Sequence, residues 1–167
     1  MNKVSRSIIA TEPAAARFAS LDDVPKIVEI LAAMHHESRY AAWPLEPEKL
    51  RGLVQGLIGY KDGACIVVEE AGELVGVLLG LVMEFFFSRQ RVASELVHYM
   101  RPAFRGSLAE TQLAQWFIEW AEATDAVEIQ SGGWVGVPEL EAEAFYSGLG
   151  FTSSCRSFAK EISHVRS

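Results

Sequence analysis

Residues 100–110, which read MRPAFRGSLAE, decide the fold of this chain. An apolar run, residues 96–100, leads into the stretch, and apolar residues at helical spacing follow it as far as Trp120. The stretch is therefore predicted to connect a strand to a helix. The start of a helix gathers unpaired backbone N–H groups at the positive end of the helix dipole, so we expect an anion-binding loop here.

The rest of the chain alternates between strand and helix patterns. Apolar spacing and turn residues predict helices at residues 21–37, 48–60, 107–123 and from Pro138 onward. They predict strands at residues 16–19, 64–69, 74–84, 94–100, 126–130, 151–154 and 157–162. Residues 71–73 form a tight turn, so the second and third strands are expected to make a hairpin. This order of elements predicts a mixed α+β fold.

Composition narrows the class of protein. The chain has 167 residues, half of them hydrophobic, which suits one domain at residues 15–167 after a tail at 1–14. A net charge of −7 argues against nucleic-acid binding and is compatible with a cationic substrate. Two cysteines give no disulfide framework, and we find no signal peptide or apolar stretch long enough to cross a membrane. We therefore expect a cytoplasmic protein with reduced thiols that binds neither membranes nor nucleic acid.

Two motifs in this chain resemble the GNAT superfamily of N-acetyltransferases. Pro102-x-x-Arg105-Gly106 resembles the first half of its pyrophosphate loop. Ala142-x-x-x-Tyr146-x-x-x-Gly150-Phe151 resembles its C-terminal pattern and is the more specific signal. The resemblance implies the GNAT fold, with a mixed central sheet of six to seven strands flanked by about four helices. It also implies acetyl-CoA as the cosubstrate and no metal.

The loop departs from the family pattern at two positions. Leu108 and Glu110 stand where the family usually has small residues, and Glu139 stands where Asn is common in the second motif. Ser107 and Glu110 have the spacing of a capping box, in which the serine hydroxyl accepts from the Glu110 N–H and the carboxylate accepts from the Ser107 N–H. A carboxylate in that position competes with a phosphate for the same donors, so we expect Glu110 either to swing outward or to weaken coenzyme A binding.

The resemblance assigns roles to individual residues. The donor is expected in a cleft between the strands that contain Met100 and Ile129. Tyr146 is expected to act as general acid, because a phenol with a pKa of about 10 can protonate the departing thiolate. The residues expected to contact the donor follow the pattern of the loop. They are Met100, Arg105, Gly106, Ser107, Leu108, Ala109 and Glu110.

The general base is left between two residues. Glu95 and His98 lie three positions apart on one predicted strand, so they are expected to face opposite sides of the sheet. At most one of them then reaches the cleft. The resemblance favours Glu95, and His98 is the alternative.

The resemblance implies that the acceptor is an amine on a small molecule or a protein. Tyr40 and Trp43, in a loop between two helices, and Gln130 are the expected contacts, and residues 85–87, all phenylalanine, can extend an aromatic wall. His35 and His36 lack the spacing of a metal site. A homodimer is compatible with the sequence. Because of the irregular loop, a GNAT-fold protein that binds acyl-CoA or a partner without turnover remains the alternative function.

Overall fold

A computed structural model describes residues 14–132, 137–154 and 160 of the chain. It consists of two units, one ending at Gly136 and one beginning at Val137, and each is described here by itself. The expected tail at residues 1–14, except Ala14, and the expected strand at 157–162, except Lys160, lie outside the described residues.

The first unit is built on a five-stranded mixed sheet with strand order β1-β2-β3-β4-β5. Its strands are β1 (Ala15–Phe18), β2 (Gly63–Glu70), β3 (Glu73–Glu84), β4 (Arg91–Met100) and β5 (Ala126–Gln130). The first four pair antiparallel, and β5 pairs parallel to β4. The hairpin of β2 and β3 and the α+β class are as predicted, whereas the described sheet has five strands rather than six to seven.

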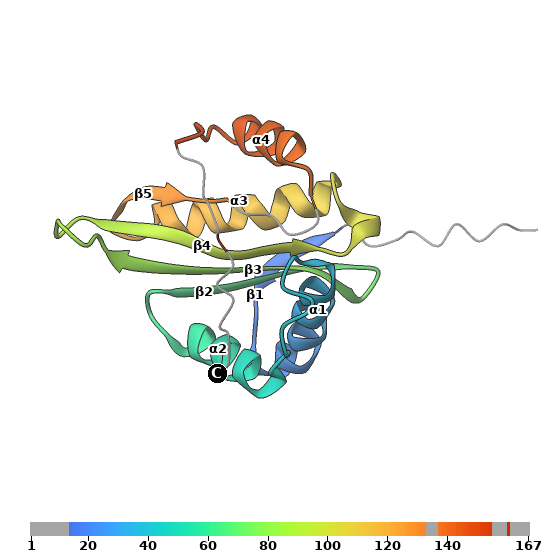
Figure 1. The fold of residues 1–167 in the computed structure, drawn as a ribbon. Helices are drawn as coiled ribbons and strands as arrows, with labels where there is room; N and C mark the ends of the chain where they lie inside the picture. The colour runs from blue at the N-terminus through green and yellow to red at the C-terminus, as the bar shows by residue number, and fades with distance from the viewer. Residues whose placement is uncertain (1–13, 133–136, 155–159, 161–167) are drawn as a thin grey trace, which may run out of the picture. The chain divides into compact units, whose positions relative to one another are not determined.

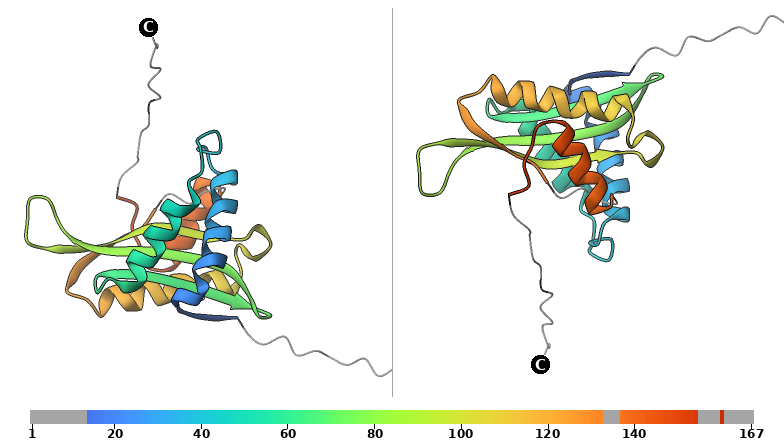
Figure 2. Two further views of the ribbon diagram at one scale, coloured as in Figure 1. Left: turned by 90° about the horizontal axis from the view of Figure 1, so that it is seen from below. Right: turned by 90° about the horizontal axis from the view of Figure 1, so that it is seen from above.

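Helices cover both faces of this sheet (Figure 1). Two of them, α1 (Val24–Glu37) and α2 (Pro47–Gly59), pack on one face and on each other, as the view from below shows (Figure 2). Their apolar stripes meet Cys65, Val67, Val77, Leu79 and Tyr99 of the sheet. The opposite face carries α3 (Leu108–Glu122), which buries Ala109, Leu113 and Phe117 against Ile66, Leu78 and Met100. We call these the α1 face and the α3 face.

The helix predicted at residues 21–37 begins with a separate 3-10 turn, η1 (Leu21–Asp23). Asp23 holds this turn because its Oδ2 accepts the Ser20 N–H at 2.7 Å. The same carboxylate receives two hydrogen bonds from the Arg17 guanidinium, at 2.7 and 2.9 Å. Pro25 follows in the first turn of α1, where a missing N–H costs nothing.

Two glycines of β3 allow close packing on the α3 face. A Cβ on Gly80 would lie 2.4 Å from the Phe117 ring, and a Cβ on Gly76 would lie 2.1 Å from the Met100 sulfur. Both distances are far shorter than van der Waals contact. The side chains of Phe117 and Met100 therefore fill the space above β3 that other residues at positions 76 and 80 would occupy.

The second unit contains α4 (Glu139–Gly148), which ends in a Schellman motif. Gly150 adopts a left-handed conformation with φ of 89°, and the N–H of Phe151 donates to the Tyr146 carbonyl at 3.0 Å. The N–H of Gly150 donates to the Ser147 carbonyl at 3.1 Å. The prediction of a strand at residues 151–154 is wrong, because these residues form no strand. The Phe151 N–H instead donates to the cap of α4.

Candidate active site

The loop that follows β4 leads directly into α3, as the sequence predicts. It contains a short 3-10 turn, η2 (Pro102–Phe104), and then Gly106, whose φ of 71° lies in the left-handed region that favours glycine. Ser107 is extended, with ψ of 170°, and α3 begins at Leu108. We call residues 101–107 the donor loop. It places a helix N-terminus and Arg105 together at the end of β4, which suits an anion.

The capping box predicted in this loop is wrong in its details. The Glu110 carboxylate accepts the Gly106 N–H at 2.5 Å rather than the Ser107 N–H, which already donates to the Phe104 carbonyl at 3.3 Å. The Ser107 hydroxyl makes no cap hydrogen bond, and its oxygen is buried with no hydrogen-bond partner. Glu110 is only 2% exposed. A buried carboxylate therefore occupies one of the backbone donors in the donor loop.

Arg105 is held against the end of α1. Its Nη2 donates to Glu37 Oε2 at 2.5 Å, its Nε donates to the Met100 carbonyl at 3.2 Å, and its Cζ lies 5.5 Å from the centre of the Tyr99 ring. The Tyr99 hydroxyl donates to the other oxygen of Glu37. Arg105 and Tyr99, in that order, keep the pKa of Glu37 below its usual value. Burial, followed by Glu37, raises the pKa of Tyr99 to about 12.

Sequence reasoning missed Glu37 and Tyr99. Glu37 is 68 residues from Arg105, and no motif connects them. The only available signal was an acidic residue in the last turn of a helix, where the negative end of the dipole disfavours it and a cationic partner is to be expected.

The edge of β4 next to the donor loop is not paired with β5. The two strands pair from Arg91 with Ala126 to Ser94 with Gln130, and β4 continues for six residues beyond that point. Among the strands of the described sheet, Glu95 to Met100 therefore pair with β3 and not with β5. The ladder stops where β5 itself ends, at Gln130.

Glu95 and His98 lie on the same face of the sheet, so their predicted opposite orientation is wrong. A β-bulge is the reason: Glu95 pairs with Gly80 and Val97 with Leu79, which leaves Leu96 without a partner on β3. The extra residue reverses the alternation of side chains. Glu95 Oε2 lies 3.6 Å from His98 Nδ1, and both side chains are almost fully buried, with 3% and 1% exposed.

The pairing places this Glu–His pair on the α3 face, because His98 pairs with Leu78 and Glu95 with Gly80, both of which contact α3 there. Gln130 pairs with Ser94, one position before Glu95, and is therefore on the α1 face. Its amide donates to Glu128 Oε1 at 2.8 Å, and the residue is exposed.

The other expected donor contacts differ in exposure. Met100 is 2% exposed and packs in the α3-face core, so only its backbone is offered to a ligand. Ala109 is also in that core, whereas Leu108 is 69% exposed. Of these three side chains, only that of Leu108 is open to solvent.

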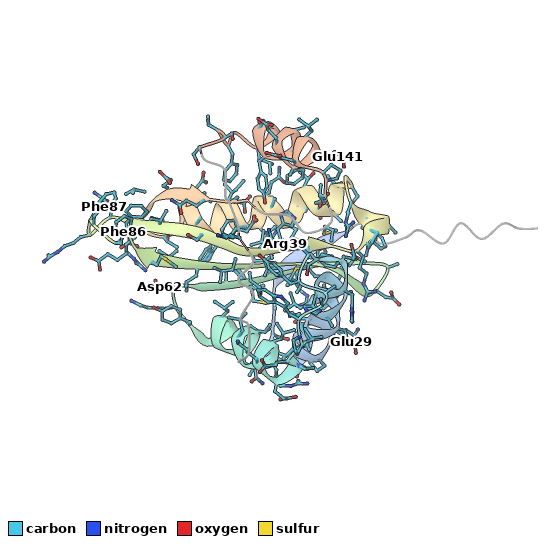
Figure 3. The ribbon with its side chains drawn as sticks, viewed as in Figure 1. Glu29, Arg39, Asp62, Phe86, Phe87 and Glu141 are labelled. Atoms are coloured by element: carbon cyan, nitrogen blue, oxygen red, sulfur yellow. The ribbon has the colours of Figure 1, made fainter. Side chains whose placement is uncertain are left out.

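The expected aromatic wall is divided between two places. Tyr40 and Trp43 pack together between α1 and α2, with ring centres 4.7 Å apart, and both are exposed. Phe86 and Phe87 lie at the tip of the β3–β4 hairpin, 88% and 74% exposed (Figure 3). The same figure shows Arg39, the neighbour of Tyr40, well away from this tip.

Other candidate sites are not supported by the geometry. Among the described residues, no group of three or more His, Cys, Asp or Glu side chains could hold a metal ion. His35 and His36 contact each other edge to face, with ring centres 5.7 Å apart. Burial raises the pKa of the Cys65 thiol to about 12, so it is a poor nucleophile. No helix in the described part of the chain has both the length and the apolar character to cross a bilayer.

Tyr146 belongs to the second unit and lies in the last turn of α4. Its ring contacts Phe145 and Phe151 edge to face, with centres 5.6 and 5.4 Å away. The contact with Phe151 is the apolar contact that accompanies a Schellman motif. The Tyr146, Gly150 and Phe151 positions of the second motif thus have a structural role in ending α4.

Comparison with known proteins agrees with this geometry. The model of the Acetyltransferase (GNAT) family matches residues 27–151. Among solved structures, AAC(6′)-Iy in complex with the bisubstrate analogue CoA-S-monomethyl-acetylneamine superposes with a TM-score of 0.71 at 14% identity, covering 90% of this chain and 99% of that one. Glucosamine-6-phosphate N-acetyltransferase from Arabidopsis thaliana gives 0.69 at 14% identity, covering 91% and 100%.

A transcriptional regulator from Bacillus halodurans C-125 gives a TM-score of 0.66 at 22% identity, covering 89% of this chain and 99% of that one. These identities show a common fold, and no curated protein sequence matches the chain. The family model, by contrast, spans most of the chain, including both motifs and the donor loop between α1 and α4. The chain belongs to the GNAT family of acetyltransferases.

Proposed function

We propose that the chain transfers an acetyl group from acetyl-CoA to an amine, which attacks the thioester directly. The observation that carries this proposal is the junction of β4 and α3. There the donor loop presents Gly106, Arg105 and a helix N-terminus beside a strand edge that is unpaired toward β5. A pyrophosphate suits the first part and an extended pantetheine arm suits the second.

The bulge at Leu96 supports the placement of the reacting carbonyl. Leu96 has no partner on β3, and pairing with β5 ends two residues earlier, at Ser94. Backbone N–H groups that lie outside a sheet ladder are ready donors for a developing oxyanion. We place the thioester carbonyl beside this bulge, at the unpaired edge of β4.

In the proposed reaction, three side chains handle the proton transfers that accompany acetyl transfer. The amine nitrogen forms a bond to the acetyl carbon, and the bond from that carbon to the coenzyme A sulfur breaks. Glu95, with His98 beside it, takes the proton that the ammonium must lose, and Tyr146 gives a proton to the departing thiolate. A protonated phenol can act in this way at neutral pH.

The acceptor is a small-molecule or protein amine. Tyr40 and Trp43 offer exposed aromatic rings, and Gln130 offers a polar group on the same α1 face as these helices. Exposed aromatic rings on a chain with a net negative charge suit a cationic ligand. Polyamines, amino acids, aminoglycosides and protein amines all fit this description.

A second function is favoured by Glu110. Its buried carboxylate accepts the Gly106 N–H and opposes a phosphate there. The alternative is therefore a GNAT-fold protein that binds acyl-CoA or a partner without turnover. The test is thiol release from acetyl-CoA with a panel of the four acceptor classes. Thiol release that depends on an amine, together with an acetylated product by mass spectrometry, supports the enzyme. Coenzyme A binding without such release supports the second function. No coenzyme A binding contradicts both the enzyme and the acyl-CoA-binding form of the alternative.

A further inference from the structure

Glu37 and Arg105 form an ion pair between the end of α1 and the donor loop. The two groups approach to 2.5 Å, and their side chains are 30% and 22% exposed. Tyr99 donates its hydroxyl to the other carboxylate oxygen and lies against the guanidinium. Glu37 is therefore a fixed, charged partner of the residue that the donor's phosphates would be expected to contact.

A carboxylate and a phosphate are alternative partners for a guanidinium. Both present oxygens that match its planar set of N–H donors, and a phosphate carries more charge. A donor with a pyrophosphate can therefore draw Arg105 away from Glu37. A donor that lacks phosphate has nothing to offer in exchange.

When Arg105 moves from Glu37 to a phosphate, the C-terminal end of α1 loses its cationic partner. Glu37 is the last residue of that helix, at the negative end of its dipole, and without a counter-charge it destabilises the last turn. The connection to α2, which carries Tyr40 and Trp43, begins at the next residue. Loss of the ion pair at Glu37 therefore destabilises the start of the connection that carries the proposed acceptor contacts.

We propose that Glu37 determines specificity for the donor. Its carboxylate competes with the donor's phosphates for Arg105, and this competition couples phosphate binding to the connection between α1 and α2. The inference rests on the proposed function for the identity of the donor. It does not depend on turnover.

The test compares two ligands and three variants by calorimetry at constant ionic strength. The ligands are coenzyme A and pantetheine, which lacks the phosphates. Glu37→Gln removes the competing charge without changing the shape of the side chain, and we expect coenzyme A to bind about fivefold or more tightly while pantetheine binding is unchanged. Glu37→Asp retains the charge and stays closer to wild type. Glu29→Gln, on the exposed side of the same helix, controls for net charge (Figure 3).

Hydrogen exchange of residues 36–46 gives the second readout. Coenzyme A should increase exchange in this segment of the wild type, pantetheine should not, and Glu37→Gln should exchange faster already without ligand. Weaker coenzyme A binding in Glu37→Gln, or a change no larger than in Glu29→Gln, overturns the inference, as does a wild type that binds no coenzyme A. Coenzyme A binding with the expected pattern but no amine-dependent thiol release overturns the proposed function alone.

Discussion

Glu95 Oε2 lies 3.6 Å from His98 Nδ1, although three positions separate the two residues on one strand. In a regular strand this spacing puts side chains on opposite faces. The bulge at Leu96 removes that separation and brings a carboxylate and an imidazole together at the strand edge that is unpaired toward β5.

Substituting the two members of this pair separately tests which one takes the proton. We expect Glu95→Gln to lower kcat/KM by about 10²-fold or more, because the amide cannot accept a proton. His98→Gln should have a smaller effect. The KM for acetyl-CoA should hold in both, and circular dichroism should confirm folding, since both side chains are buried. Wild-type rates in both variants would exclude the pair.

Glu110 gives a prediction about donor affinity. Glu110→Gln removes the charge that opposes a phosphate at Gly106, so coenzyme A should bind several-fold more tightly. Glu119→Gln, exposed on the same helix, is the matched control for net charge. Calorimetry measures both. Unchanged or weaker binding in Glu110→Gln would show that its carboxylate does not compete with the donor.

Tyr146→Phe tests the proposed general acid. The variant retains the ring that contacts Phe151, so α4 should end as before and coenzyme A binding should hold. Turnover should fall by about 10²-fold or more, since the hydroxyl proton is lost. Tyr60→Phe, an exposed tyrosine after α2, serves as control. Turnover of Tyr146→Phe at the wild-type rate would leave the residue with only its packing role.

Two neighbouring glycines of the second unit should respond in opposite ways to alanine. Gly150 has φ of 89°, where a Cβ is strained, so Gly150→Ala should lower the free energy of unfolding by about 1 kcal/mol. Gly148 is helical with open space around it, so Gly148→Ala should be neutral or stabilising. Urea unfolding of both variants checks this. Equal effects would contradict the Schellman motif.

Asp23 should make the free energy of unfolding depend on pH in the acid range. The hydrogen bonds from Arg17 hold the pKa of Asp23 well below its usual value. In the pH range between the folded and unfolded values the unfolded chain binds more protons, so this stabilisation is complete above about pH 4 and is lost as pH falls. Asp23→Asn should be less stable than wild type at pH 7, and the difference should shrink toward pH 2. A constant difference would argue against the ion pair.

Local patterns were sufficient to predict most of the fold. The junction of β4 and α3, the hairpin of β2 and β3 and the bounds of β5 all follow from apolar spacing and turn residues. These features could be predicted because each depends on residues that are close together in the sequence. The Schellman motif shows the limit: Phe151 and Thr152 are residue types that favour strands, but the Phe151 N–H completes the cap of α4.

The arrangement of the candidate site was harder to predict because apolar spacing and turn residues do not reveal the three contacts that determine it. Leu96 is an ordinary apolar residue in an apolar run, and nothing in its surroundings marks the bulge. The Ser107 N–H is taken by the turn that precedes it, which moves the Glu110 carboxylate to Gly106. The partner of Arg105 comes from a helix on the other side of the sheet.

The two glycines of β3 bear on how this chain can vary. A methyl group at Gly80 or Gly76 has no room unless Phe117 or Met100 moves. Either movement lifts α3 from the sheet or shifts the last residue of β4, and both carry the donor loop with them. Substitutions at two buried positions that no ligand can touch would thus alter donor affinity.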